Sequence, residues 1–240
     1  MKTYVIGDIH GNYKALKQVI DRSPINKEED RLIVLGDVVD GYPDVIECID
    51  ELLTFDNLIG IWGNHDDWAY RFLKTGWKEN IWLNQGGLAT LKSYTNNPEK
   101  QQEHLDKYFS NLKYYHVIGD KCFVHGGFDW HSGDVTNTDP QELMWDRHMV
   151  EVAQIWQAQH DIRKIELQKF PFYSRIFVGH TDTRYNLSGI YAPSLNPQFL
   201  SNLIMLDTGA GWKGKLTIMN VDSLEYWQSD KSTSHEEYKK

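Results

Sequence analysis

The sequence contains few cysteines, fewer basic than acidic residues and no long apolar run. Its 240 residues include two cysteines, Cys48 and Cys122, too few for a disulfide-rich scaffold. We expect both to be buried free thiols in a reducing compartment, although the sequence leaves a single disulfide open. No apolar run approaches the ~20 residues that a membrane-spanning helix needs, and no signal peptide precedes the first expected strand. We therefore expect a cytoplasmic protein without a membrane partner.

The charge balance also limits the partners of the chain. Asp and Glu number 34 against 25 Lys and Arg, and the net charge of −9 argues against a nucleic acid as the main partner. Hydrophobic residues make up 40% of the chain, which is enough for a sizeable core. Because we find neither an internal repeat nor a linker, we expect one domain over residues 1–228. The polar tail at 229–240 is expected to be disordered.

Short polar signatures follow five apolar runs along the chain. Each run is β-prone and ends at a glycine that lies next to Asp, Asn or His. A lone Gly-Asp pair is usually a turn, and a lone His on a strand is more often structural than a ligand. Four of the ten histidines nevertheless occupy such positions, which chance would rarely produce. The segments are 3–11, 32–41, 58–67, 122–127 and 176–181, and the histidines are His10, His65, His125 and His180.

The spacing of apolar residues predicts an α/β fold in which these signatures converge. Helical spacing over 12–20 and 43–53 separates strands expected at 4–6, 31–35 and 58–62. This alternation predicts a β-α-β-α-β unit with parallel strands. Because ligands in such folds meet outside the carboxyl ends of the strands, the signatures predict one metal site.

The rest of the chain contains an insertion and further strands. Residues 68–118 form an aromatic-rich insertion that we expect to be helical. Packing on the sheet explains its aromatic residues more simply than a pocket rim does. Further strands are expected at 115–124, 175–178, 203–209 and 215–221, a helix at 141–168 and an irregular loop at 185–200.

The types of candidate ligand indicate the kind of metal. Asp, Asn and His offer oxygen atoms and neutral imidazoles, which suit Mn²⁺, Fe or Zn²⁺ better than Mg²⁺ or Ca²⁺. The candidate ligands are too many for one ion, so two ions that share a bridging carboxylate are implied. Two ions ~3.5–4 Å apart can hold both oxygens of an in-line displacement at phosphorus. A histidine held by a carboxylate could then protonate the leaving alkoxide.

The signatures, taken in order, resemble those of the calcineurin-like metallophosphoesterases. They read G-D-I-H-G, G-D-V-V-D, G-N-H-D, V-H-G-G and G-H-T. N-Q-G-G, L-M-W-D-R and L-D-T-G-A-G-W-K-G-K-L-T also resemble segments of the phosphoprotein-phosphatase branch, which includes bacterial Ser/Thr phosphatases and the bacteriophage lambda phosphatase. The resemblance covers residues 4 to about 221. It implies central mixed β-sheets in a β-sandwich flanked by α-helices, with the metal site at the carboxyl ends of the strands.

The resemblance also implies a role for each matching residue. His65 would be the general acid, oriented by Asp40, and Arg147 would bind phosphate oxygens. From the residues alone, Arg147 reads as a helix-surface arginine, and Asp66 and Asp67 read as helix N-caps. The implied cofactor is two divalent ions, with Mn²⁺ preferred and Fe or Zn²⁺ as alternatives. The implied ligands are Asp8, His10 and Asp37 for one ion, and Asn64, His125 and His180 with the bridging Asp37 for the other.

One position departs from the family pattern. The second family signature ends in an arginine that grips the substrate phosphate, but this sequence has Gly41 there. Arg184, which follows G-H-T, or Lys213 in the last turn could replace that arginine, since both lie near the site in sequence. A weaker phosphate clamp would also favour a bulkier or diester substrate.

The sequence leaves three functions open and does not indicate an oligomeric state. The resemblance implies hydrolysis of phosphate monoesters by in-line attack of a hydroxide that bridges the two ions. Its substrates would be Ser/Thr or Tyr phosphoproteins or small phosphoesters. The alternative is a phosphodiesterase or dinucleotide-polyphosphate hydrolase of the same superfamily, with aromatic residues of 68–82 stacking a base. An inactive, metal-stabilised binding protein fits less well, because it would not need the Asp40–His65 pair.

Overall fold

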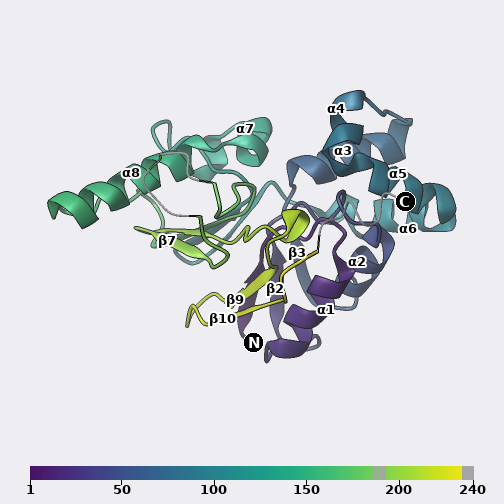
Figure 1. Ribbon diagram of the computed structural model, residues 1–240, viewed down its shortest axis with the longest axis horizontal. Helices are drawn as coiled ribbons and strands as arrows, with labels where there is room; N and C mark the ends of the chain where they lie inside the picture. The colour runs from purple at the N-terminus through teal and green to yellow at the C-terminus, as the bar shows by residue number, and fades with distance from the viewer. Residues whose placement is uncertain (186–188, 190–192, 234–240) are drawn as a thin grey trace.

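The computed structural model describes residues 1–185, 189 and 193–233, and its centre is a pair of five-stranded sheets (Figure 1). The first sheet has the order β10 (Tyr226–Gln228), β9 (Thr217–Asn220), β1 (Thr3–Ile6), β2 (Arg31–Val34) and β3 (Asn57–Gly60). The second has the order β4 (Tyr115–Ile118), β5 (Lys121–Val124), β6 (Arg175–Val178), β8 (Leu203–Met205) and β7 (Gln198–Leu200). Both sheets are mixed, as the resemblance implied.

Each sheet contains three neighbouring parallel strands. β1, β2 and β3 pair in parallel and are connected by α1 (Tyr13–Arg22) and α2 (Val45–Leu52), which confirms the predicted β-α-β-α-β unit. Asn12 caps α1, because its side-chain oxygen accepts a hydrogen bond from the Ala15 N–H at 3.1 Å. β5, β6 and β8 are also parallel. Each sheet therefore presents several carboxyl ends at one edge.

The two sheets pack face to face. Val5 and Ile33 of the first sheet share a buried cluster with Phe123 and Phe177 of the second. Tyr4 points to the other face of β1, into a cluster that includes α1 and α2. Successive side chains of a strand point to opposite faces, so these central strands must be apolar on both. The result is a β-sandwich flanked by helices.

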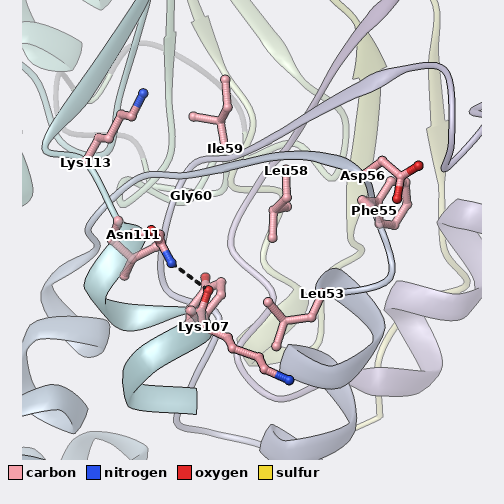
Figure 2. Close-up of a pocket in the computed structure, with 11 residues that line it drawn as sticks. Leu53, Phe55, Asp56, Leu58, Ile59, Gly60, Lys107, Asn111 and Lys113 are labelled. Carbon is pink, nitrogen blue, oxygen red and sulfur yellow. Dashed lines mark hydrogen bonds between the residues drawn. The ribbon is translucent and has the colours of Figure 1, made fainter. Parts of the chain in front are cut away.

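The insertion is largely helical and lies beside α2 (Figure 1). Half of its ten aromatic side chains are buried in the core of the first sheet, for example Trp82, Tyr94 and Phe109, and three more are partly buried against that core, as core packing predicts. A pocket of about 310 Å³ lies where the insertion meets β3, with Leu53 and Lys107 in its lining (Figure 2). It contains none of the predicted site residues. The elements are α3 (Asn64–Thr75), α4 (Asn80–Trp82), the kinked turn η1 (Leu83–Gly87), α5 (Leu88–Asn96), α6 (Glu99–Lys107) and the 3-10 helix η2 (Phe109–Asn111).

Three elements differ from the sequence prediction. Residues 115–124 are not one strand but the β4–β5 hairpin, because Gly119 turns the chain with φ +58°. The helix predicted at 141–168 is α7 (Pro140–Trp145) and α8 (His148–Arg163). It breaks at Asp146, whose carboxylate accepts hydrogen bonds from the N–H groups of the next helix. The loop predicted at 185–200 contains β7, and part of it lies outside the described residues.

The start of the C-terminal tail is held against the domain. Ser229 is buried, and its hydroxyl oxygen accepts a hydrogen bond from the Leu216 N–H at 2.9 Å. The Asp230 carboxylate pairs with Arg22 of α1 at 2.8 Å. The prediction of a disordered tail is therefore wrong for residues 229–233, which contacts with Leu216 and α1 hold in place. Residues 234–240 lie outside the described part of the chain.

Candidate metal centre

The eight residues predicted as metal ligands or as the acid pair lie together, and all are buried. They come from the carboxyl ends of strands in both sheets. Because the two sheets pack with these ends at a common edge, segments that are far apart in sequence meet there. Asp8 and His10 follow β1, Asp37 and Asp40 follow β2, Asn64 and His65 begin α3 after β3, His125 follows β5, and His180 follows β6.

Four of these residues have backbone conformations that non-glycine residues rarely adopt. The φ angle is +52° at His10, +50° at Asp37, +68° at Asp40 and +57° at His180. Each costs roughly 1–3 kcal/mol, and such strain persists only where the surrounding structure fixes it, often at a functional site. The turns after β1, β2 and β6 therefore direct these side chains at the expense of local backbone stability.

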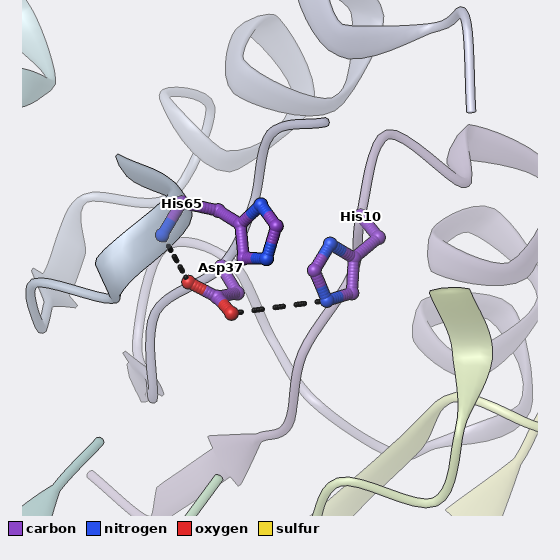
Figure 3. A group of neighbouring side chains, drawn as sticks. All are labelled: His10, Asp37 and His65. Carbon is purple, nitrogen blue, oxygen red and sulfur yellow. Dashed lines mark hydrogen bonds and ion pairs between the residues drawn. The ribbon is translucent and has the colours of Figure 1, made fainter. Parts of the chain in front are cut away.

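Two groups of candidate ligands share Asp37. In the first, His10, Asp37 and His65 bring one ligand atom each within 4.8 Å of one another (Figure 3). In the second, Asp37, His125 and His180 do the same. His125 Nε2 lies 3.3 Å from Asp37 Oδ2 and 3.2 Å from Asn64 Oδ1, so Asn64 adjoins the second group. A carboxylate shared by two groups has the position that a bridging ligand requires.

The protonation of the histidines suits metal binding. Burial lowers the pKa of His180 well below its ordinary value, and the neighbouring His125 lowers it further. Burial and His65 lower the pKa of His10 to about 4. Both imidazoles are therefore neutral near neutral pH, which is the form that binds metals. The buried Nε2 of His180 has no hydrogen-bond partner within the described part of the chain, although buried polar atoms are rarely left unpaired.

The carboxylates of the pocket also favour a cation. Asp8 accepts a hydrogen bond from the His180 N–H at 3.1 Å and belongs to neither group of three. Burial and the nearby Asp207 and Asp37 carboxylates raise the pKa of Asp8 well above its ordinary value. A divalent cation would offset this repulsion, so the donor set and its charges fit two such ions.

Glycines of the signatures allow these side chains to approach the backbone. A Cβ atom on Gly63 would lie 2.1 Å from Asp37 Oδ1, and one on Gly179 would lie 2.3 Å from Asp8 Oδ1. Any side chain at either position would displace a carboxylate of the site. The geometry of the site therefore requires glycine at positions 63 and 179.

Asp66 and Asp67 have different roles. The Asp66 carboxylate accepts a hydrogen bond from the Gly63 N–H at 3.2 Å, which confirms that it caps the start of α3. It also accepts hydrogen bonds from the N–H groups of Asp37 at 2.7 Å and Val38 at 3.1 Å, so it fixes the loop after β2. Asp67 instead pairs with Arg71 one turn along the helix at 2.6 Å, and the prediction of a cap is wrong there.

His65 and Asp40 form the pair that the resemblance implied. The Asp40 Oδ2 atom lies 2.7 Å from His65 Nδ1, which leaves the Nε2 atom of His65 for the pocket. Burial alone would lower the pKa of His65, but the Asp37 and Asp40 carboxylates outweigh it and raise that pKa to about 9. The imidazole is therefore charged at neutral pH in the absence of metal, as a proton donor must be.

The candidate phosphate-binding residues differ in how they are held. Arg147 donates hydrogen bonds to the His180 carbonyl at 3.1 Å and lines the pocket. Arg184 also lines the pocket, but its guanidinium binds the Asp182 carboxylate and donates to the Trp212 carbonyl at 2.7 Å. Lys213 does not line the pocket. Arg147 is therefore better placed than the other two to bind an anion.

The pocket above these residues has a volume of about 590 Å³. Its rim contains three part-exposed aromatic side chains, Trp145, Tyr185 and Trp212, which the sequence analysis did not single out. Two of them lie in segments that carried the resemblance, L-M-W-D-R and L-D-T-G-A-G-W, so a signal was present. Gln85 also lines the pocket, whereas the aromatic residues of 68–82 do not. Their predicted alternative role as a stacking surface is therefore not supported.

The chain is similar to a family of phosphoesterases and to individual enzymes of known name. Residues 1–184 match the family described as calcineurin-like phosphoesterase. The chain is 24% identical to the asymmetrical bis(5'-nucleosyl)-tetraphosphatase PrpE of Bacillus cereus (strain Q1), over 94% of this chain and 92% of that protein. It is also 24% identical to serine/threonine-protein phosphatase 2 of Escherichia coli (strain K12), over 91% and 92%.

The fold is also similar to that of a solved structure. A proposed diadenosine tetraphosphatase superposes with a TM-score of 0.63 and 15% identity, over 97% of this chain and 94% of that one. At this identity the likeness concerns the fold alone. Among the described residues, no helix has the length and apolar character that crossing a membrane would require.

Proposed function

The chain belongs to the calcineurin-like phosphoesterase family of dinuclear metal-dependent hydrolases, and from this premise we propose that it hydrolyses phosphate monoesters. The first substrate class that we propose is phosphoproteins carrying phosphoserine, phosphothreonine or phosphotyrosine. The observation that carries the proposal is the buried Asp40–His65 pair beside two ligand groups that share Asp37. A proton donor is needed when the leaving group is an alkoxide, which is the case for serine and threonine esters.

The proposed metal ligands are those that the resemblance implied, and they share His10, Asp37, His125 and His180 with the two groups in the structure. Asp8, His10 and Asp37 would hold one ion, and Asn64, His125 and His180 with Asp37 would hold the other. We propose Mn²⁺, and Fe or Zn²⁺ fit the same mixture of oxygen and imidazole ligands. When bound, the two cations supply an activated water as nucleophile and the positive charge that stabilises the phosphoryl oxygens.

The residues of the chain perform the remaining steps. Arg147 binds phosphoryl oxygens and orients the ester, since its guanidinium lines the pocket. As the water oxygen bonds to phosphorus, the bond to the leaving oxygen breaks and its electron pair stays on that oxygen. The Nε2 proton of His65 then goes to the leaving oxygen, and Asp40 keeps the ring in orientation. The neutral imidazole regains, through solvent, the proton that the attacking water gave up.

A second function, hydrolysis of dinucleoside polyphosphates, has its own supporting observation. The rim aromatics Trp145, Tyr185 and Trp212 surround the pocket, and aromatic rings of this kind can stack on a nucleobase. Gly41 replaces the usual phosphate-binding arginine, which removes one contact to a compact monoester. The similarity to PrpE and to the Escherichia coli phosphatase is equal in identity, so it favours neither substrate.

Activity assays with Mn²⁺-loaded protein separate these functions. We would compare nitrophenyl phosphate, bis-nitrophenyl phosphate, a phosphopeptide and a dinucleoside tetraphosphate, with Asp37→Asn and His65→Asn as inactive variants. Asp222→Asn, an exposed carboxylate that pairs with Lys121, is the matched control. Cleavage of the monoester and the phosphopeptide supports the first function, and cleavage of the dinucleotide alone supports the second. Bound Mn²⁺ without hydrolysis of any substrate would contradict both and support a binding protein.

A further inference from the structure

Asp40 accepts hydrogen bonds from two residues of the insertion besides His65. Its Oδ2 atom accepts one from the indole N–H of Trp82 at 2.8 Å, and its Oδ1 atom accepts one from the Thr90 hydroxyl at 2.5 Å. The backbone N–H of Asp40 donates in turn to the Thr90 hydroxyl oxygen at 2.9 Å. Asp40, Trp82 and Thr90 have no exposed surface. The carboxylate therefore has partners on both oxygens, which fixes its plane.

The segment that carries Trp82 and Thr90 is itself docked on the loop after β2. The Gly41 N–H donates a hydrogen bond to the Gly86 carbonyl at 3.1 Å. A Cβ atom on Gly86 would lie 2.6 Å from the Gly41 nitrogen, so the two backbones touch. Gly86 lies at the kink of η1, and its φ of +105° is one that glycine adopts readily and other residues rarely do. Gly41, where the family has an arginine, is thus one of the points at which the insertion contacts this loop.

Packing also fixes the indole of Trp82. The ring lies 5.2 Å from Phe72 and is stacked on Trp77 at 5.9 Å, measured between ring centroids. A Cβ atom on Gly87 would lie 2.3 Å from the same indole. With its ring held on several sides, Trp82 presents its N–H to Asp40 in one orientation.

This inference rests on the proposed function, in which His65 protonates the leaving group. We propose that Trp82 and Thr90 are positioning residues for that step. They hold the Asp40 carboxylate in one plane, and Asp40 holds the His65 ring so that Nε2 faces the leaving oxygen. The insertion then helps to orient the proton donor His65, although neither Trp82 nor Thr90 lines the pocket.

A positioning role for Trp82 and Thr90 predicts that the effect of each variant depends on the leaving group, whereas a general structural role predicts no such dependence. A poor leaving group needs the proton of His65 as its bond to phosphorus breaks, whereas a good leaving group departs as a stable anion without it. Loss of a positioning residue should therefore slow the cleavage of phenyl phosphate much more than that of dinitrophenyl phosphate. A variant that merely damages the fold should slow both substrates equally.

The variants remove the hydrogen bonds to Asp40: Thr90→Val keeps the shape of the side chain and loses both bonds of the hydroxyl, whereas Trp82→Phe loses one bond and also has a smaller ring. Trp82→Phe removes the indole N–H, Thr90→Val removes the hydroxyl, and Thr90→Ser restores it. We expect the first two to lower kcat for phenyl phosphate by ~10–100-fold, with KM changed little, and to spare dinitrophenyl phosphate. Trp156→Phe and Thr95→Val are the controls, since Trp156 packs on Phe170 in the core of the second sheet and the Thr95 hydroxyl donates to the Leu91 carbonyl, away from the groups that hold Asp40.

A second readout does not depend on activity or on metal. The Nδ1–H proton that His65 shares with Asp40 should give a strongly downfield proton signal in the NMR spectrum of the metal-free protein. We expect the signal to be absent in His65→Asn, to shift in Trp82→Phe and Thr90→Val, and to be unchanged in both controls. In the His65→Asn background, Thr90→Val should no longer alter the ratio of the two substrates, because the coupled partner is missing.

The outcomes separate this inference from the proposed function. Equal losses on both substrates, or no loss, in Trp82→Phe and Thr90→Val would overturn the positioning role while His65 keeps its own role. If His65→Asn itself showed no dependence on the leaving group, the assignment of His65 would fail and the positioning role with it. Selective loss in both insertion variants, with recovery in Thr90→Ser, would support the inference.

Discussion

Removing divalent cations should markedly lower the thermal stability of this protein. The carboxylates of Asp8, Asp37 and Asp207 are almost completely buried in one pocket. Like charges at such positions repel one another, and Asp207 and Asp37 both help to raise the pKa of Asp8. Bound cations would replace this repulsion with attraction in the folded state only. Their removal should therefore destabilise the folded protein relative to the unfolded chain.

The size of the effect follows from binding linkage. An ion present at 100 times its dissociation constant stabilises the folded state by about 2.7 kcal/mol, so two ions contribute roughly 5 kcal/mol. For a domain of 150–250 residues, each kcal/mol changes Tm by about 2–4 °C. Saturation of both proposed sites with Mn²⁺ should thus raise Tm by roughly 10–20 °C over that of the chelated protein.

Differential scanning fluorimetry over a Mn²⁺ titration measures this shift. Asp37→Asn should lose most of it, because Asp37 belongs to both ligand groups. Asp222→Asn removes an exposed carboxylate and should keep the full shift. A Tm that does not respond to chelation in the wild-type protein would refute the reasoning, as would an equal loss of the shift in the two variants.

Three further predictions concern the substrate, the core and the construction of the site. Arg147→Ala should raise KM for nitrophenyl phosphate by ~10–100-fold in steady-state kinetics. Arg184→Ala should raise KM less, because the Asp182 carboxylate already neutralises the charge of Arg184, and equal effects of the two variants would contradict this ranking. Phe177→Ala should lower the free energy of unfolding in urea by ~3–5 kcal/mol, because the Phe177 ring is fully buried between the two sheets. A decrease below about 1 kcal/mol would contradict that packing. Gly63→Ala should weaken Mn²⁺ binding in calorimetry, because its Cβ atom would displace the neighbouring carboxylate, and unchanged affinity would argue against that contact.

The parts of the fold that the sequence predicted are those with local signals. The β1–α1–β2–α2–β3 unit was predictable because apolar residues change from strand to helical spacing. The convergence of the site residues was predictable because each lies just after an apolar run, in a segment that also contains a glycine. The turn at Gly119 and the helix break at Asp146 were not predictable, because each lies inside a stretch whose apolar spacing indicates one continuous element.

Other features depend on contacts between distant parts of the chain. The hydrogen bonds from Trp82 and Thr90 to Asp40 join residues that are 42 and 50 positions apart in the sequence, and no periodic pattern of residues predicts them. The fixation of residues 229–233 depends on partners more than 200 positions away, such as Arg22. The roles of the ligands, of the acid pair and of Arg147 remain predictions that the geometry supports.

The central claim is that two ions bind on either side of Asp37. Anomalous X-ray diffraction from crystals soaked in Mn²⁺ tests it most directly, because it locates each ion without reference to activity. We expect two anomalous peaks ~3.5–4 Å apart, both within bonding distance of Asp37, one also near His10 and the other near His125 and His180. A single peak, or ions that do not contact Asp37, would contradict the two-ion site and the phosphoesterase mechanism that depends on it.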